Sequence, residues 1–285
     1  MKKYLKLMRV HHYIKNLLVF AALICGGQIF NLEKTEAGLA GFAAFCLVSS
    51  AVYIINDIRD REKDRKHPSK CHRPIANGTV SVKNAVMLVV ILLIAASVCN
   101  GLFFHLDATL LLALYFVLNI LYSLGLKNIP ILDISILVSG FLIRIVYGAC
   151  VTGITVSNWL YLTVISLAFY FSLGKRRNEL DRSGGSTRDV LKSYPSSFLD
   201  KNMYMCLALA NVFYALWSMD ENTMRMYGST RLVLTVPLVL VITMKYSLDI
   251  EGDSDGDPVE VLLSDRILLC LCGAYLVLMF VILYS

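Results

Sequence analysis

The chain has 285 residues, of which 57% are hydrophobic and only 17% are charged, and its mean hydropathy is +0.64. A water-soluble domain carries roughly a quarter charged residues and keeps a polar face on most of its helices. The composition therefore excludes a soluble globular protein and indicates one embedded in lipid. The formal net charge of +6 does not indicate nucleic-acid binding, because the basic residues lie in a few short polar stretches between apolar runs. The eight cysteines show no spacing typical of a metal site.

A helix of about 20 apolar residues is needed to cross the hydrocarbon of a bilayer. We therefore predict an all-α integral membrane protein, a bundle of nine transmembrane helices, with small residues such as Gly26, Gly41, Gly140 and Gly148 allowing close packing in a monomer or a homo-oligomer. The predicted spans lie at about 14–30, 36–55, 84–104, 107–125, 131–152, 158–174, 203–219, 230–248 and 262–284.

The distribution of positive charge predicts the orientation, because Lys and Arg in short loops stay on the cytoplasmic side. The N-terminal tail and the connections after the second, fourth and sixth spans hold 21 basic residues, and the opposite side holds three. We expect a cytoplasmic N-terminus in a bacterial-type plasma membrane and one transmembrane domain over 1–285. Two long cytoplasmic connections, about 56–83 and 175–202, would carry the active site. The acidic segment 249–260 is expected to be a solvated loop.

The second span leads into an aspartate-rich stretch. Asp57, Asp60 and Asp64 stand at positions i, i+3 and i+7, so they share one face if the helix continues into the cytoplasm. Neighbouring carboxylates repel each other unless a cation joins them, and Mg²⁺ is usually held by one or two carboxylates together with substrate phosphates. The pattern predicts water-facing acids that bind a Mg²⁺-diphosphate, with Asn56 as a neutral ligand or an orienting residue. A solvated charged helix is the alternative, since Arg61, Lys63 and Arg65 interleave the acids.

The surrounding basic residues favour the diphosphate site. Cations beside a metal bind phosphate oxygens and neutralise a departing diphosphate. Lys15 and Asn16 lie where the first span enters the same membrane face. The basic residues that directly follow the acids are Arg65, Lys66, Lys70, His72 and Arg73.

The motif Asn56-Asp57-x-x-Asp60-x-x-x-Asp64 after the second span resembles the first aspartate-rich motif of the UbiA-type membrane transferases. The resemblance covers nearly the whole chain from about Leu5. Within the family, the chain is most similar to members that transfer phosphoribose to a polyprenyl phosphate of the decaprenyl type. The similar segments are 15–21, 67–76, 122–127, 132–133, 139–144, 174–180, Tyr194, 246–250 and 265–266.

This resemblance implies a UbiA-type bundle with Mg²⁺ and a diphosphate substrate in a cavity open to the cytoplasm and the bilayer. The implied reaction transfers phosphoribose from 5-phosphoribosyl 1-diphosphate to the lipid phosphate and releases diphosphate. Asp57, Asp60 and Asp64 would be catalytic and would hold the metal together with Asn56. The residues expected to bind substrate are Lys15, Asn16, Lys66, Arg73, Tyr122, Lys127, Arg144, Lys175, Arg176, Glu179 and Tyr194.

The segment Lys175-Arg176-Arg177 departs from the pattern of the aromatic-prenylating relatives. Those relatives carry a second aspartate-rich motif there, whereas this chain keeps only Glu179 and Asp181 as acids. We interpret the basic residues as a grip for the additional 5-phosphate of the donor. Retention of positive charge on the cytoplasmic side is the alternative explanation for them.

Three further residues have two explanations each. Arg144 lies near the middle of the fifth span, where an arginine costs about 2.5–3.5 kcal/mol unless it faces water or a partner, so it either lines the site or braces the bundle. Asp133 either serves the site or interacts favourably with the N-terminus of its helix. Tyr194 either binds substrate or anchors its loop at the membrane interface.

Two other functions remain open. One is a UbiA-type prenyltransferase that joins a prenyl diphosphate to an aromatic or other small acceptor, which predicts a second acidic cluster. The other is a carrier for an anionic lipid or sugar phosphate. Carriers usually bind their substrate near the membrane midplane between paired repeats, whereas the charges here gather on one membrane face.

Overall fold

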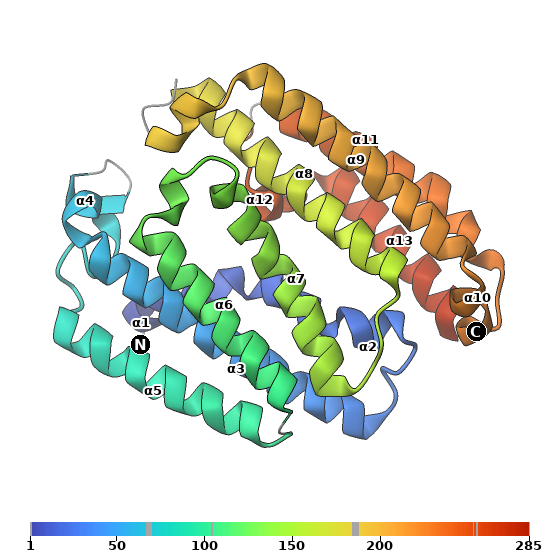
Figure 1. The fold of residues 1–285 in the computed structure, drawn as a ribbon, viewed down its shortest axis with the longest axis horizontal. Coiled ribbons are helices and arrows are strands. Elements are labelled where there is room, and N and C mark those ends of the chain that lie inside the picture. Colours follow the sequence, from blue (N-terminus) through green and yellow to red (C-terminus); the bar gives the residue numbers. More distant parts are fainter. Residues whose placement is uncertain are drawn as a thin grey trace. The chain divides into compact units, whose positions relative to one another are not determined.

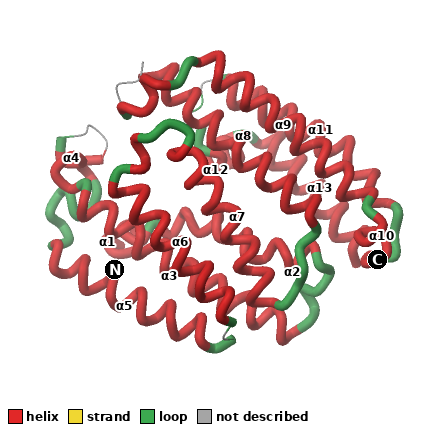
Figure 2. The backbone as a smooth tube through the Cα atoms, viewed as in Figure 1, coloured by secondary structure: helices red, strands yellow, loops and turns green. Residues whose placement is uncertain are grey.

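The computed structural model describes residues 2–66, 70–103, 105–183, 188–252, 254 and 256–284. The described residues form helices and loops, with no β-strand among them (Figures 1 and 2). The chain divides into two compact units, which are described separately. Unit 1 comprises Met1–Leu124 and Ile143–Thr155, and unit 2 comprises Gly125–Leu142 and Val156–Ser285. His67, Pro68 and Ser69, which are part of the similar segment 67–76, lie outside the described residues.

Unit 1 is built around one long helix, α3 (Leu32–Arg59), which contacts α1, η1, α5 and α6. The other elements are α1 (Lys2–Met8), η1 (Val10–Phe20), α2 (Ala21–Cys25), α4 (Arg61–Arg65), η2 (Lys70–His72), α5 (Val82–Gly101), α6 (Leu106–Leu124) and the second half of α7 (Leu132–Thr152). Side-chain caps define where two of the helices begin. Asn31 accepts a hydrogen bond from the backbone N–H of Lys34, and Ser81 accepts one from that of Asn84.

A close backbone contact fixes η1 against α7 inside unit 1. A Cβ atom added at Gly148 would lie 1.9 Å from the carbonyl oxygen of Val19. Only glycine allows this approach. Around it, Phe45 and Val48 of α3 pack with Tyr147 of α7. The structure thus supports the expectation that Gly148 is a packing residue.

Unit 2 is a set of long helices that pack in succession: α8 along α9, α9 against α11, and α11 against α13 (Figure 1). Its core contains Ile134 of α7, Tyr170 of α8, Met203 of α9 and Ile250 of α11. The elements are η3 (Leu126–Asn128), the first half of α7, α8 (Asn158–Ser183), η4 (Asp189–Ser193), α9 (Ser196–Met219), α10 (Glu221–Tyr227), η5 (Arg231–Thr235), α11 (Val236–Glu251), α12 (Pro258–Ser264) and α13 (Arg266–Tyr284).

Several helices expose large apolar side chains. Helix α5 exposes a stripe in which Met87, Ile94 and Val98 are each about 60% exposed. Only 22% of its most apolar 18-residue stretch is buried. Among the described residues, α3, α5, α6, α7 and the segment Arg231–Glu251 are long and apolar enough to cross a membrane. The pair Pro258–Ser264 and Arg266–Ile282, bent by 98°, would make a sixth span. These helices are those of an integral membrane protein. The count of nine spans and the cytoplasmic N-terminus stay predictions.

The structure differs from the predicted elements at two places that matter for the site. The predicted span 14–30 is the 3₁₀ helix η1 followed by the short α2. Helix α8 does not stop at 174 but continues to Ser183, so Lys175, Arg176 and Arg177 lie on a helix instead of in a loop. The helix continues there because Arg176 pairs with Glu179 and Arg177 with Asp181, at the i+3 and i+4 spacings that support a helix.

Candidate functional site

Two carboxylates of unit 1 converge on one guanidinium group. Nη1 of Arg73 donates to Oδ1 of Asp57 at 3.1 Å and to Oδ2 of Asp64 at 2.7 Å. Helix α3 ends at Arg59 and α4 begins at Arg61, with Asp60 in the turn between them. The backbone N–H of Asp60 bonds to the Asn56 carbonyl, and that of Asp64 bonds to the Asp60 carbonyl. Helical hydrogen bonding therefore continues through the break and carries Asp64 around to the side of Asp57.

Both carboxylates are buried, so the expectation that they face water is wrong. Asp57 is 2% exposed and Asp64 is 4% exposed. A second arginine compensates Asp57, since Nη2 of Arg9 lies 2.6 Å from the same Oδ1 atom. The Arg9 guanidinium also lies over the Tyr53 ring, 4.9 Å from its centroid. Buried carboxylates are stable only when paired in this way.

Sequence reasoning did not single out Arg9 as a site residue. It precedes the first apolar run, and its basic charge was explained by its predicted cytoplasmic position. The signal that could have found it is its level in the membrane, because Arg9 and Asp57 lie at the predicted cytoplasmic ends of consecutive spans. Such a pair of opposite charges is expected to meet when the two helices pack.

The loop between η2 and α5, residues 73–81, positions Arg73. Arg65 of α4 donates from Nε to the Ala76 carbonyl oxygen at 3.0 Å. Ile75 and Val80 are 1% and 2% exposed and pack in one cluster with Ile54 of α3. The loop is therefore held against the end of α3, and this keeps the guanidinium of Arg73 beside the two acids.

The other predicted residues of unit 1 on this side have different surroundings. Asn56 accepts a hydrogen bond at Oδ1 from the Ser123 hydroxyl of α6, so its oxygen is engaged in the α3–α6 contact, which favours the orienting role. Asp60, Lys15 and Tyr122 are partly buried, and Lys66 is exposed. The structure thus brings Asp57, Asp64 and Arg73 together most closely.

Arg144 and Asn16 meet inside unit 1. Arg144 is 6% exposed and donates from Nε to Oδ1 of Asn16 at 2.8 Å. Its Nη2 atom lies 3.2 Å from the Tyr115 hydroxyl, and its guanidinium lies about 5 Å from the ring centroids of Phe45 and Tyr115. Asn16 in turn donates to the Ser49 hydroxyl at 3.1 Å. These contacts favour the bracing role of Arg144, because they join α7 to η1, α3 and α6.

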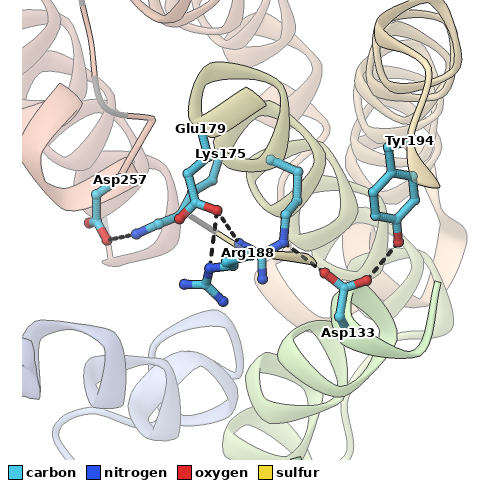
Figure 3. Close-up of polar contacts among 7 residues, drawn as sticks. Asp133, Lys175, Glu179, Arg188, Tyr194 and Asp257 are labelled. Atoms are coloured by element: carbon cyan, nitrogen blue, oxygen red, sulfur yellow. Dashed lines mark hydrogen bonds and ion pairs between the residues drawn. The ribbon is translucent and has the colours of Figure 1, made fainter. Parts of the chain in front are cut away.

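Unit 2 contains a polar network centred on Asp133, which is 0% exposed (Figure 3). Arg176 donates from Nε to one carboxylate oxygen at 2.8 Å, and the Tyr194 hydroxyl donates to the other at 2.6 Å. Arg176 also donates from Nη1 to Glu179 at 2.8 Å, and Nε of Arg188 lies 3.4 Å from the same Glu179 oxygen. Burial, and then the hydrogen bond to the Asp133 carboxylate, raise the pKa of Tyr194 to about 12.

This network bears on the explanations for Asp133 and Tyr194. Asp133 is more than a charge at a helix N-terminus, because it accepts hydrogen bonds from Arg176 on α8 and from Tyr194 after η4. Tyr194 is 5% exposed, which excludes an interfacial anchor that projects from the protein. Both residues join helices inside unit 2.

The prediction of a solvated loop for the acidic segment 249–260 is wrong where the structure describes that segment, because two of its acids pair with basic residues of α8. Lys175 donates to Asp257 at 2.9 Å, and Asp257 is 8% exposed and caps α12 through the Val259 N–H. Arg177 donates to Glu251 at 2.7 Å. The extension of α8 explains the difference, because it presents these basic residues to the acids. Asp253 and Asp255 lie outside the described residues, and Lys127, on η3, is partly buried.

The acid pair of unit 1 fits a metal that arrives with its own ligands. Within the described ranges, no group of three or more His, Cys, Asp or Glu side chains is arranged to hold a metal. Asp57 and Asp64 nevertheless present two hard oxygen atoms to one cationic nitrogen. Mg²⁺ usually takes one or two carboxylates and completes its octahedron with water and substrate phosphates. The donor set therefore suits a Mg²⁺-diphosphate complex better than a free ion.

Long apolar helices, with a buried acid pair around the end of α3, define an α-helical integral membrane protein. The model of the UbiA prenyltransferase family matches residues 17–258, and the chain belongs to this family. It is 33% identical to the decaprenyl-phosphate phosphoribosyltransferase of Mycolicibacterium smegmatis, over 95% of this chain and 89% of that protein. It is 34% identical to the enzyme of the same name from Corynebacterium glutamicum, over 95% and 83% of the two chains.

The fold agrees with this assignment. A UbiA homolog from Archaeoglobus fulgidus, solved with GPP and Mg²⁺, superimposes with a TM-score of 0.72 at 18% identity, over 99% of this chain and 100% of the other. The resemblance that the motifs indicated is confirmed, and the protein is an integral membrane transferase.

Proposed function

We propose that the protein transfers phosphoribose from 5-phosphoribosyl 1-diphosphate to a polyprenyl phosphate. The observation that carries the proposal is the similarity to two decaprenyl-phosphate phosphoribosyltransferases over 95% of this chain. The convergence of Asp57, Asp64 and Arg73 supports it, since the donor is a diphosphate. The site would face the cytoplasm of a bacterial-type plasma membrane.

The reaction breaks the bond between C1 of ribose and the diphosphate oxygen, and the diphosphate leaves with the electron pair. An oxygen of the lipid phosphate forms the new bond to C1. Because this oxygen is already anionic, the reaction needs no strong general base. Mg²⁺, when bound, neutralises negative charge on the diphosphate. Asp57, Asp60 and Asp64 would hold it, and Asn56 would orient the end of α3.

Arg73, Lys66, Lys15, Tyr122 and Lys127 are proposed to contact substrate. Arg73 offers a planar pair of donors that suits phosphate oxygens. Its side chain is 27% exposed, so solvent reaches it beside the buried acids. The division of the phosphates among these residues is part of the proposal that variants would test.

In unit 2, the contacts suggest different roles for neighbouring residues. The Lys175 side chain is 31% exposed and makes an ion pair with Asp257, and we propose that it binds a phosphate. The Arg176 side chain is 1% exposed and lies between two carboxylates. We propose that Arg176, Glu179 and Tyr194 keep α7 and α8 in position and affect substrate binding through that packing.

An assay with both substrates tests the proposal. Purified protein in detergent is incubated with labelled 5-phosphoribosyl 1-diphosphate and polyprenyl phosphate, with Mg²⁺ or with a chelator. We expect a lipid-linked phosphoribose and an equal amount of diphosphate, with Mg²⁺ only. Absence of transfer, together with prenylation of an aromatic acceptor from a prenyl diphosphate, would establish the alternative prenyltransferase. Conversion in detergent, without a sealed membrane, would exclude a carrier.

A further inference from the structure

The acid pair of unit 1 already has a cation. Arg73 contacts both carboxylates through one nitrogen atom, Nη1, whereas Arg9 contacts Asp57 and not Asp64. The side chains of Asp57 and Asp64 are 3% and 6% exposed. Buried carboxylates that lost their partner would be strongly destabilised. The arrangement therefore balances the two charges before any ligand binds.

A metal that contacts both acids competes with Arg73. Because Nη1 bridges Asp57 and Asp64, a cation between these two oxygens must take its place. Arg9 does not compete in this way, since it contacts Asp57 without touching Asp64. Arg9 can stay on Asp57 and hold that carboxylate in place while a metal ion replaces Arg73 between the two acids.

The free energy of replacing Arg73 by a metal ion differs between free metal and metal bound to a diphosphate. Free metal leaves the displaced guanidinium without the carboxylates, beside an added double positive charge. Metal that arrives on a diphosphate offers phosphate oxygens, and a guanidinium binds those through two parallel hydrogen bonds. The Arg73 side chain is 27% exposed, against 6% for Asp64, so the arginine is the partner with access to an incoming anion.

We propose that Arg73 is a specificity-determining residue that keeps free divalent metal off Asp57 and Asp64 and yields to metal bound to a diphosphate, with Arg9 as the positioning residue of Asp57. This inference rests on the proposed function. According to this inference, metal binding at the two acids depends on diphosphate because of Arg73 alone.

Two binding measurements with opposite expected signs test the proposal. The first is binding of Mn²⁺ alone, followed by electron paramagnetic resonance, and the second is binding of ³²P-labelled inorganic diphosphate at saturating Mg²⁺. Coupling between two ligands in proteins is typically about 5- to 150-fold. We expect R73Q to bind Mn²⁺ about tenfold more tightly than the wild type and to bind diphosphate about tenfold more weakly.

The matched control is K63Q. Lys63 is exposed on α4 and directly precedes Asp64 in the sequence, so this variant removes the same charge and leaves the ion pairs of Arg73 with Asp57 and Asp64 in place. It is expected to change Mn²⁺ affinity by less than about twofold, through the general field of the protein. If R73Q gains no more Mn²⁺ affinity than K63Q, the inference is overturned.

The outcomes separate the inference from the proposed function. A wild-type protein that does not bind labelled diphosphate with Mg²⁺ contradicts both. Diphosphate binding by the wild type without an Mn²⁺ gain in R73Q contradicts only the role of Arg73. Because R73Q removes the ion pair of buried Asp64, its thermal unfolding is measured first. If R73Q does not fold, R73K replaces it: a lysine offers a single point charge, so we expect an Mn²⁺ affinity above wild type, and an unchanged affinity overturns the inference.

Discussion

Asp57 and Asp60 are three positions apart, yet their surroundings differ. Asp57 is buried under Arg9 and Arg73, whereas Asp60 is partly exposed in the turn between α3 and α4. The same Asp-to-Asn change at the two positions therefore separates loss of function from loss of stability. The pattern of acids in the sequence treats the two residues alike, and the difference arises from the neighbours that each acquires on folding.

We predict that D57N and D60N both abolish transfer, because each removes a charge that would hold the metal. D57N should in addition lower the free energy of unfolding by about 1.5–3 kcal/mol, the usual contribution of a hydrogen bond to a charged group. D60N should lower it less. Transfer assays and thermal unfolding in detergent measure the two effects. Full activity in both variants would contradict the assignment of these acids to the metal.

The buried pair of Asp133 and Arg176 leads to a prediction for unit 2. Removing one partner of a buried ion pair typically costs about 3–5 kcal/mol, because the other charge is left unpaired. We expect D133N and R176Q each to show a loss of this size in thermal unfolding. The double variant D133N/R176Q should lose less than the sum. K175Q is the control, since Lys175 is more exposed. Equal stability of R176Q and K175Q would rule out the bracing role.

At the scale of elements, η1 and α7 approach each other closely enough that only a glycine fits at position 148. An eleven-residue 3₁₀ helix is unusually long, and its position depends on the approach of Val19 to Gly148. The same segment begins directly after Arg9, which has a left-handed backbone conformation with φ of 52°. The packing of η1 therefore also determines where the guanidinium of Arg9 lies relative to Asp57.

We predict that G148A destabilises the protein by about 1–3 kcal/mol or more, because its Cβ would overlap the Val19 carbonyl and force the two elements apart. Thermal unfolding in detergent measures the loss. The control is G101A on α5, where a Cβ meets no atom within 4 Å. That variant is expected to be neutral or to gain up to about 1 kcal/mol of helix propensity. Similar behaviour of the two variants would contradict the close contact.

At the scale of the whole molecule, the apolar runs predicted most helices closely, since a run of apolar residues has few alternatives to a membrane helix. The predicted span 107–125 is α6 (Leu106–Leu124), and the span 131–152 is α7 (Leu132–Thr152). The apolar run at 158–174 did not predict the end of α8, which lies at Ser183. Charged residues there end a span without ending the helix, because pairs at the i+3 and i+4 spacings, Arg176 with Glu179 and Arg177 with Asp181, continue it.

The acid motif predicted that Asp57 and Asp64 lie on one side beside Arg73, but not that Arg9 compensates Asp57. Arg9 is 48 positions from Asp57, and Arg144 is 128 positions from Asn16. Local spacing carries no information about such contacts, because they depend on which helix faces pack. The same holds for Asp257, which lies 82 positions from its partner Lys175. The network around Asp133 was likewise open to two explanations until its partners were known.

The bare apolar stripe of α5 determines how the proposed reaction must be quantified. Because Met87, Ile94 and Val98 are exposed, the protein stays in a lipid bilayer or a detergent micelle. A polyprenyl acceptor dissolves in the same bilayer or micelle. The two meet by lateral diffusion in two dimensions. Saturation by the acceptor is therefore governed by its mole fraction among lipid and detergent molecules, and KM for the acceptor takes that unit, whereas KM for the water-soluble sugar keeps molarity.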